Sequence, residues 1–166
     1  MIVLLNGAPR SGKSSIVAAI QETFDGIWMN VGVDVARRMT PERAQPGIGL
    51  RPGEPQHPAA VVKPTLYAAL WETVAAHHRL GLDVVVDVGV YEPSVAEDAR
   101  RRLAELPLLL VGVRCPLDVL EARGGAARWH EAVHSVWDYD LEVDTSQLDP
   151  YRCAAAIAEQ LGSFLA

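Results

Sequence analysis

The sequence of 166 residues is poor in lysine and contains no long apolar run. Its two lysines, Lys13 and Lys63, stand beside thirteen arginines, and acidic residues outnumber basic ones to give a net charge of −6. Excess negative charge argues against a surface that coats nucleic acid, although a local positive pocket can still bind a small anion. No apolar run approaches the ~20 residues of a membrane-spanning helix, so we expect neither a nucleic-acid partner nor a membrane partner.

Cysteine is also scarce, with Cys115 and Cys153 far apart in the sequence. Residues 1–6 are apolar, but no basic residues precede them, so we interpret them as a strand rather than a signal peptide. We therefore expect a cytoplasmic protein in which both thiols are reduced. The length suits one domain, residues 1–166, built around one core.

What the sequence does contain is a glycine-rich phosphate-binding pattern, or P-loop, close to its start. Residues 7–14, Gly-Ala-Pro-Arg-Ser-Gly-Lys-Ser, match G-x-x-x-x-G-K-[ST] at every fixed position. An apolar run precedes the pattern and a helical run, residues 15–21, follows it, as this motif requires. The alternative, a glycine-rich turn without a ligand, requires the match to arise by chance.

The motif assigns roles to its residues. Its glycines let backbone N–H groups approach an anion, and the following helix adds the partial positive charge of its N-terminus. Lys13 is predicted to reach the β- and γ-phosphates of a nucleotide, and the Ser14 hydroxyl is predicted to bind Mg²⁺. The predicted nucleotide-binding residues are Gly7, Ala8, Pro9, Arg10, Ser11, Gly12, Lys13, Ser14 and Ser15.

Apolar runs that alternate with helical patterns predict an α/β fold with a parallel sheet. Strands are expected over residues 1–6, 27–33, 82–87, 107–113 and 139–143. Helices are expected over residues 13–24, 35–39, 64–80, 92–106, 116–123 and from 150 onward. In such sheets, ligands bind beyond the C-terminal ends of the strands.

Two segments are predicted to be loops beside this edge. Residues 41–64 contain six prolines and three glycines. They predict a flexible acceptor-side loop, with a disordered interdomain linker as the alternative. Residues 124–137 are interpreted as a short lid. Arg123 and Arg128 are predicted to neutralise charge on a transferred phosphoryl group there, with solvated helix-end arginines as the alternative.

Two aspartates follow predicted strands and are candidates for chemistry beside the P-loop. Asp87 ends an apolar run, the Walker B pattern, and is predicted to complete the Mg²⁺ site with Ser14. Asp34 follows the strand expected over residues 27–33 and is the candidate general base for an attacking hydroxyl. An N-cap for the helix at residues 35–39 fits the spacing of Asp34 equally well.

A competing pattern lies near the last strand. Residues 130–134, His-Glu-Ala-Val-His, match H-E-x-x-H, in which two histidines on one helical face bind zinc and Glu131 acts as the base. Only a short helix fits between Gly125 and Tyr139, and no nearby acidic residue stands out as a third ligand. We therefore expect this segment to have another role.

With these residues placed, the sequence resembles the chloramphenicol phosphotransferase family, a branch of the P-loop small-molecule kinases. The matching segments, in family order, are residues 6–15, 31–34, 84–87, 111–115, 133–134 and 139–145. The most distinctive strings are Val-Gly-Val-Arg-Cys at 111–115 and Tyr-Asp-Leu-Glu-Val-Asp-Thr at 139–145. Two segments depart from the family: the stretch between residues 115 and 133 is shorter, and the loop at 41–64 differs in detail.

The resemblance implies a fold and an activity. The implied fold is the three-layer P-loop NTPase fold, with a five-stranded parallel sheet in the order 2-3-1-4-5 and helices on both faces. The implied reaction transfers the γ-phosphate of ATP to an alcohol of an antibiotic or similar small molecule. The family's catalytic aspartate corresponds to Asp34, and His134 falls on a family helix that leads into the last strand.

The sequence therefore predicts an ATP- and Mg²⁺-dependent kinase for a small-molecule alcohol, with chloramphenicol as one example of an acceptor. The predicted catalytic residues are Lys13, Asp34, Arg123 and Arg128, and the predicted metal ligands are Ser14 and Asp87. Two alternatives stay open. One is a primary-metabolite kinase of the shikimate or nucleoside type, and the other is a nucleotide-binding regulatory module whose shortened lid no longer supports transfer.

Overall fold

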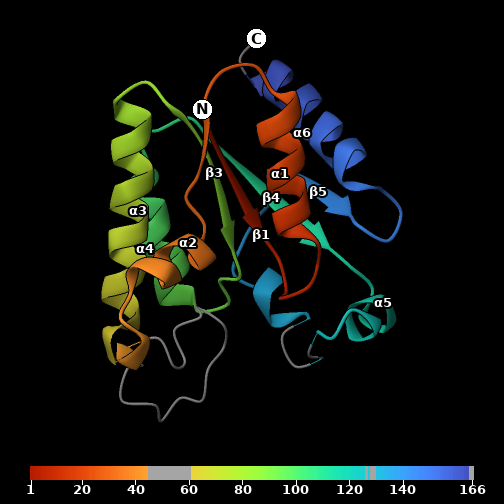
Figure 1. Ribbon diagram of the computed structural model, residues 1–166, viewed down its shortest axis with the longest axis horizontal. Helices are drawn as coiled ribbons and strands as arrows, with labels where there is room; N and C mark the ends of the chain where they lie inside the picture. The colour runs from red at the N-terminus through yellow and green to blue at the C-terminus, as the bar shows by residue number, and fades with distance from the viewer. Residues whose placement is uncertain (45–60, 126, 128–129, 165–166) are drawn as a thin grey trace.

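A five-stranded sheet lies at the centre of the computed structural model, which describes residues 1–44, 61–125, 127 and 130–164 (Figure 1). The strands are β1 (Ile2–Asn6), β2 (Trp28–Asn30), β3 (Asp83–Val88), β4 (Leu108–Arg114) and β5 (Leu141–Asp144). All are parallel, in the order β2-β3-β1-β4-β5. The predicted parallel sheet and its strand order are therefore confirmed.

Helices cover both faces of this sheet and make a three-layer structure (Figure 1). The helices are α1 (Lys13–Thr23), α2 (Val33–Met39), α3 (Lys63–Arg79), α4 (Pro93–Leu103), α5 (Leu117–Ala122) and α6 (Pro150–Phe164). Short 3₁₀ turns are η1 (Glu42–Ala44) and η4 (Ala132–His134). The P-loop, α2 and α5 gather around the end at which the strand arrows point, and both termini lie at the other end (Figure 1).

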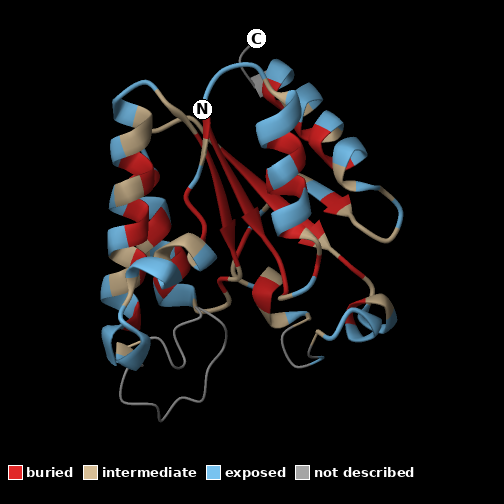
Figure 2. Ribbon diagram, viewed as in Figure 1, coloured by how far each residue is buried: buried red, intermediate tan, exposed pale blue. Residues whose placement is uncertain are grey.

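The strands alternate between two apolar layers because successive side chains point to opposite faces of the sheet. Val3 and Leu5 pack against α1 and α6. Ile2 and Leu4 pack against α3 and α4. Figure 2 shows the central strands buried along their length, which explains why their sequences are nearly continuous apolar runs. By the same alternation, Asn6 faces the α3 and α4 layer.

The region before α2 differs from the prediction. The strand expected over residues 27–33 ends at Asn30, and α2 begins at Val33 with Gly32 as its N-cap. A Cβ atom on Gly32 would lie 3.1 Å from both the Cβ and the carbonyl oxygen of Asp87, so the chain turns there in close contact with β3. Asp34 therefore lies in the first turn of α2, and the N-cap alternative for Asp34 is wrong.

Most of the predicted acceptor-side loop, residues 45–60, lies outside the residues that the structure describes. Its described ends lead from η1 into the N-terminus of α3. None of the helices in the described part of the chain is long and apolar enough to cross a lipid bilayer.

Candidate active site

The P-loop lies between the ends of β3 and β4. The Gly7 N–H donates to the Val88 carbonyl at 3.3 Å, and a Cβ atom on Gly7 would lie only 2.6 Å from the Val113 carbonyl oxygen. Gly12 is the N-cap of α1 and has a φ of 99°, in the left-handed region that favours glycine. The two motif glycines thus meet two different demands, close packing at Gly7 and a left-handed turn at Gly12.

The predicted phosphate and metal residues come together at this loop. The Ser14 hydroxyl donates to Asp87 Oδ2 at 2.7 Å, and Lys13 Nζ lies 3.8 Å from Asp87 Oδ1. Lys13 is buried and donates to the carbonyls of Gly7 and Ala8 at 3.0 Å and 2.9 Å. A hydroxyl, a carboxylate and an ammonium group therefore converge at the start of α1, whose N-terminus favours anions.

The oxygen pair of Ser14 and Asp87 suits Mg²⁺, which binds hard oxygen ligands and keeps several for phosphate and water. Within the described ranges, no group of three or more His, Cys, Asp or Glu side chains is placed to hold a metal ion. A single hydroxyl and a single carboxylate would leave the other coordination positions of such an ion to phosphate and water.

Asp34 reaches the same edge from the neighbouring β2 side. It is exposed in the first turn of α2, and Gly32 holds that turn against the backbone of Asp87. An exposed carboxylate can meet an incoming hydroxyl. The general base and the metal aspartate predicted from the sequence thus stand on adjacent elements.

Arg123 is connected to the P-loop through Thr145. Its Nη1 and Nη2 donate to the Thr145 hydroxyl and carbonyl, both at 3.0 Å, and the Thr145 hydroxyl donates to the Ser11 carbonyl at 2.7 Å. Arg128 lies outside the described residues. Sequence reasoning missed the role of Thr145, whose one signal was its place in the string at 139–145.

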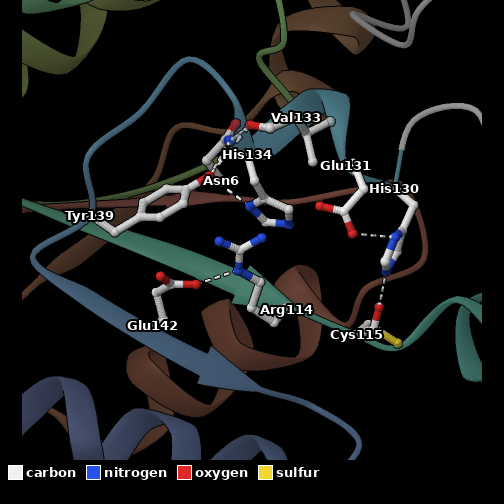
Figure 3. Close-up of polar contacts among 9 residues, drawn as sticks. All are labelled: Asn6, Arg114, Cys115, His130, Glu131, Val133, His134, Tyr139 and Glu142. Atoms are coloured by element: carbon white, nitrogen blue, oxygen red, sulfur yellow. Dashed lines mark hydrogen bonds and ion pairs between the residues drawn. The ribbon is translucent and has the colours of Figure 1, made fainter.

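Asn6 is the residue directly before the P-loop, and its side chain links three segments of the chain (Figure 3). The side chain is fully buried, and its Nδ2 donates to the Val133 carbonyl at 2.7 Å and to the Tyr139 hydroxyl at 3.0 Å. Its Oδ1 accepts from the Val90 N–H at 2.7 Å. The end of β1 is thereby fixed to the loop after β3 and to the segment before β5. The signal in the sequence was a polar residue at the end of an apolar strand.

A polar cluster continues from Asn6 toward β5. The Arg114 guanidinium forms an ion pair with Glu142 and lies 5.9 Å from the centre of the Tyr139 ring. His134 Nδ1 hydrogen-bonds with the Tyr139 hydroxyl at 2.8 Å. Burial raises the pKa of Tyr139 to about 12, so this hydroxyl stays protonated at neutral pH. Figure 3 shows the Arg114 side chain reaching toward the His134 ring.

The H-E-x-x-H residues are used differently from a zinc motif. His130 Nε2 hydrogen-bonds with the Cys115 carbonyl at 2.7 Å, and His130 Nδ1 pairs with the neighbouring Glu131 at 2.9 Å (Figure 3). The segment is one 3₁₀ turn rather than an α-helix, so His130 and His134 share no helical face. Both imidazoles instead hold the 130–134 segment to its neighbours.

The environment of His134 predicts a pH dependence of stability. Burial lowers its pKa from 6.5 to about 4, the Arg114 charge and His130 act in the same direction, and Glu131 and Glu142 oppose them. Between pH 6.5 and 4 the unfolded chain binds a proton here that the folded chain does not. Stability is therefore lost as the pH falls through this window.

We expect this loss to be on the order of 1–2 kcal/mol, allowing for solvent screening of a half-buried ring. His134→Gln keeps a hydrogen-bonding partner for Tyr139 but does not titrate, so this variant should not show the loss of stability at low pH. Urea unfolding of both proteins at pH 7 and pH 4.5 measures how much stability each loses on acidification. Carboxylates titrate in both proteins, so their contribution cancels when the two losses are subtracted. Equal losses of stability in the two proteins would contradict the assignment.

A P-loop whose Ser14 pairs with an aspartate at the C-terminal edge of a parallel sheet is the arrangement found in P-loop proteins that act on nucleotide phosphates. The comparison with known families agrees. The chain belongs to the chloramphenicol phosphotransferase-like family, whose sequence model matches residues 1–162. The predicted resemblance is therefore confirmed, and with it a small-molecule phosphotransferase activity.

Individual relatives are distant. A Mycobacterium tuberculosis protein whose name proposes an O-phosphotransferase activity is 23% identical, over 95% of this chain and 80% of its own length. A sugar kinase structure from a Janibacter species has a TM-score of 0.70 at 15% identity, covering 97% of this chain and 94% of its own. The M. tuberculosis APS kinase structure with AMPPNP and APS has a TM-score of 0.69 at 15% identity, covering 97% and 96%. At identities this low, the likeness to these two structures shows the fold alone.

Proposed function

We propose that the protein transfers the γ-phosphate of ATP to a hydroxyl group of a small molecule, with Mg²⁺ beside Ser14 and Asp87. The observation that carries the proposal is the 2.7 Å hydrogen bond between these two residues, with Lys13 3.8 Å from the same carboxylate. A P-loop that only terminates a strand has no need of a buried ammonium and a carboxylate at the start of its helix. Transfer from a bound nucleotide uses both.

The chain's own residues supply binding and charge. The N–H groups of residues 7–14 and the N-terminus of α1 would hold the phosphates, and Lys13 would exchange its carbonyl partners for phosphate oxygens. Mg²⁺, when bound, would neutralise phosphate charge during transfer. Arg123 and Arg128 remain proposed contacts of the transferred group, and Arg123 would reach it by leaving Thr145.

Asp34 is proposed as the general base. Phosphoryl transfer to an alcohol requires the hydroxyl to be oriented in line with the leaving oxygen and its proton to be accepted. Gly32, the N-cap of α2, packs against Asp87, and Asp34 is exposed in the first turn of the same helix. A hydroxyl bound between α2 and the P-loop would donate to its carboxylate. The proton would move from the acceptor hydroxyl to Asp34 as the new P–O bond forms and the bond from the γ-phosphorus to the leaving ADP oxygen breaks.

The proposed acceptor is an alcohol of an antibiotic, for which chloramphenicol is the first compound to examine because the family is described by it. Use of ATP fits a cytoplasmic protein. Phosphorylation of an antibiotic hydroxyl there would make the protein a resistance enzyme.

The test is mass spectrometry of small alcohols after incubation with the protein and Mg·ATP. The panel holds chloramphenicol, other hydroxylated antibiotics, shikimate and nucleosides, and EDTA serves as the control. We expect one panel member to gain a phosphoryl group, with an equal amount of ADP formed. Calorimetric binding of ATP without any phosphorylated product would contradict the proposal and favour a nucleotide-binding regulatory module.

A further inference from the structure

Lys63, the second of the chain's two lysines, is buried at the start of α3 and belongs to a polar cluster with two partly buried residues. Its side chain is 9% exposed, and its Nζ donates to the Tyr91 hydroxyl at 3.2 Å and pairs with Glu92 Oε2 at 2.8 Å. The Tyr91 hydroxyl donates to Glu92 Oε1 at 3.3 Å. The Lys63 ammonium also lies 4.8 Å from the centre of the Tyr91 ring. We call these three residues the Lys63 cluster.

The Lys63 cluster lies on the α3 and α4 side of the proposed site. Tyr91 packs against a small apolar group that includes Ala8 of the P-loop and Val133 of the segment before β5. Its ring therefore contacts the P-loop side, while its hydroxyl faces Lys63. An alcohol that lies between the P-loop and the N-termini of α3 and α4 is consequently adjacent to this cluster.

Helix capping and folding stability do not account for Glu92. It is the N-cap residue of α4, yet its side chain makes no capping hydrogen bond and uses both oxygens on Tyr91 and Lys63. An ion pair with one partly exposed partner contributes little net stability, because water screens the attraction. The Glu92 carboxylate is directed at Lys63 and Tyr91 rather than at the start of its own helix.

The cluster presents donors and acceptors without net charge. Lys63 donates to the Tyr91 hydroxyl and pairs with Glu92, and an ammonium carries three N–H groups, so it would offer a further one to a ligand. The Glu92 side chain is 36% exposed and can accept a further hydrogen bond. A hydroxyl or amide group of a ligand can accept a hydrogen bond from Lys63 and donate one to Glu92. A carboxylate or sulfate would instead lie beside the Glu92 carboxylate and compete with it for Lys63.

We propose that the Lys63 cluster recognises the acceptor and selects uncharged alcohols bearing hydroxyl or amide groups over alcohols that carry an acidic group. This inference rests on the proposed function, because it concerns the acceptor of that reaction. Lys63 and Glu92 make the contacts that select the acceptor, and Tyr91 positions both.

The experiment compares pairs of alcohols that share their hydroxyls and differ in one charge, such as methyl shikimate with shikimate and glucuronamide with glucuronate, together with chloramphenicol. For the unmodified protein we expect kcat/KM to favour the uncharged member of a pair by about tenfold or more. Glu92→Gln, which uncovers the Lys63 charge, should shift this preference toward the acidic member by about tenfold. Lys63→Met should raise the KM of the uncharged member about tenfold and leave the affinity for AMPPNP unchanged.

Glu72→Gln is the matched control, because Glu72 of α3 pairs with Arg102 of α4 at 2.6 Å, outside the Lys63 cluster. The double variant Lys63→Met/Glu92→Met replaces the whole ion pair and serves if a single variant fails to fold. A preference for the acidic member, or variants that shift selectivity no more than Glu72→Gln, would overturn the inference alone. Absence of transfer to every alcohol by the unmodified protein would overturn the proposed function and the inference with it.

Discussion

Asp34→Asn is expected to slow phosphoryl transfer by about 10²–10⁴-fold, the contribution of a positioned general base. Asparagine keeps the size of the side chain and can still hydrogen-bond with the acceptor hydroxyl, but its amide does not take up the proton. Because Asp34 lies in the exposed first turn of α2, the change leaves the core untouched. The affinity for ATP and the stability of the fold should stay close to those of the unmodified protein.

Single-turnover transfer to the best acceptor measures this loss, and calorimetry with AMPPNP measures nucleotide affinity. Asp118→Asn is the matched control, since Asp118 is an exposed aspartate at the same position of another short helix, α5. It should transfer at the normal rate. An Asp34→Asn protein that retains transfer within about threefold would remove Asp34 from the role of general base.

Lys13→Met should reduce kcat/KM for ATP by about 10²–10³-fold, the loss found when one preorganised donor to a developing charge is removed. The ammonium lies among the Gly7 and Ala8 carbonyls and the Asp87 carboxylate, so its charge is held in place before any phosphate arrives. Methionine fills the same volume but offers neither charge nor donor. The two carbonyls are also left without this partner, which should lower stability by about 1–3 kcal/mol.

Initial rates at varied ATP concentrations test the expected loss in kcat/KM. Urea unfolding tests the expected loss of stability. Lys63→Met makes the same chemical change at the other lysine, and it should leave the affinity for AMPPNP unaltered because Lys63 lies beyond Tyr91 from the P-loop. Equal weakening of nucleotide binding by the two variants would show that Lys13 has no special relation to the phosphates.

Local sequence patterns were sufficient to predict most of the strands, the helices and the P-loop. The apolar runs at 82–87 and 107–113 and the P-loop at 7–14 are specified by neighbouring residues, because period, turn chemistry and burial act over short distances in the chain. The pairing of Ser14 with Asp87 also followed from sequence, since parallel strands end at one edge and the motif places both residues there. The strand order came from resemblance to a family, and the structure confirms it.

Boundaries were predicted less well where a distant contact decides them. The strand before α2 stops at Asn30, and Gly32 then packs against Asp87, which is far away in the sequence. Pattern alone favoured three further strand residues. The position of Asp34 within α2, rather than at the end of a strand, follows from that contact.

By itself, the sequence determined the class of this protein, a parallel α/β kinase with a P-loop, because the motif and the apolar strands are short contiguous strings. Only the tertiary structure decided which side chains meet across the sheet. Arg123 rests on Thr145, Asn6 joins Val90 to Tyr139, and Lys63 meets Glu92, all through contacts between residues distant in the chain. Such contacts depend on how whole layers pack, and no local pattern encodes them.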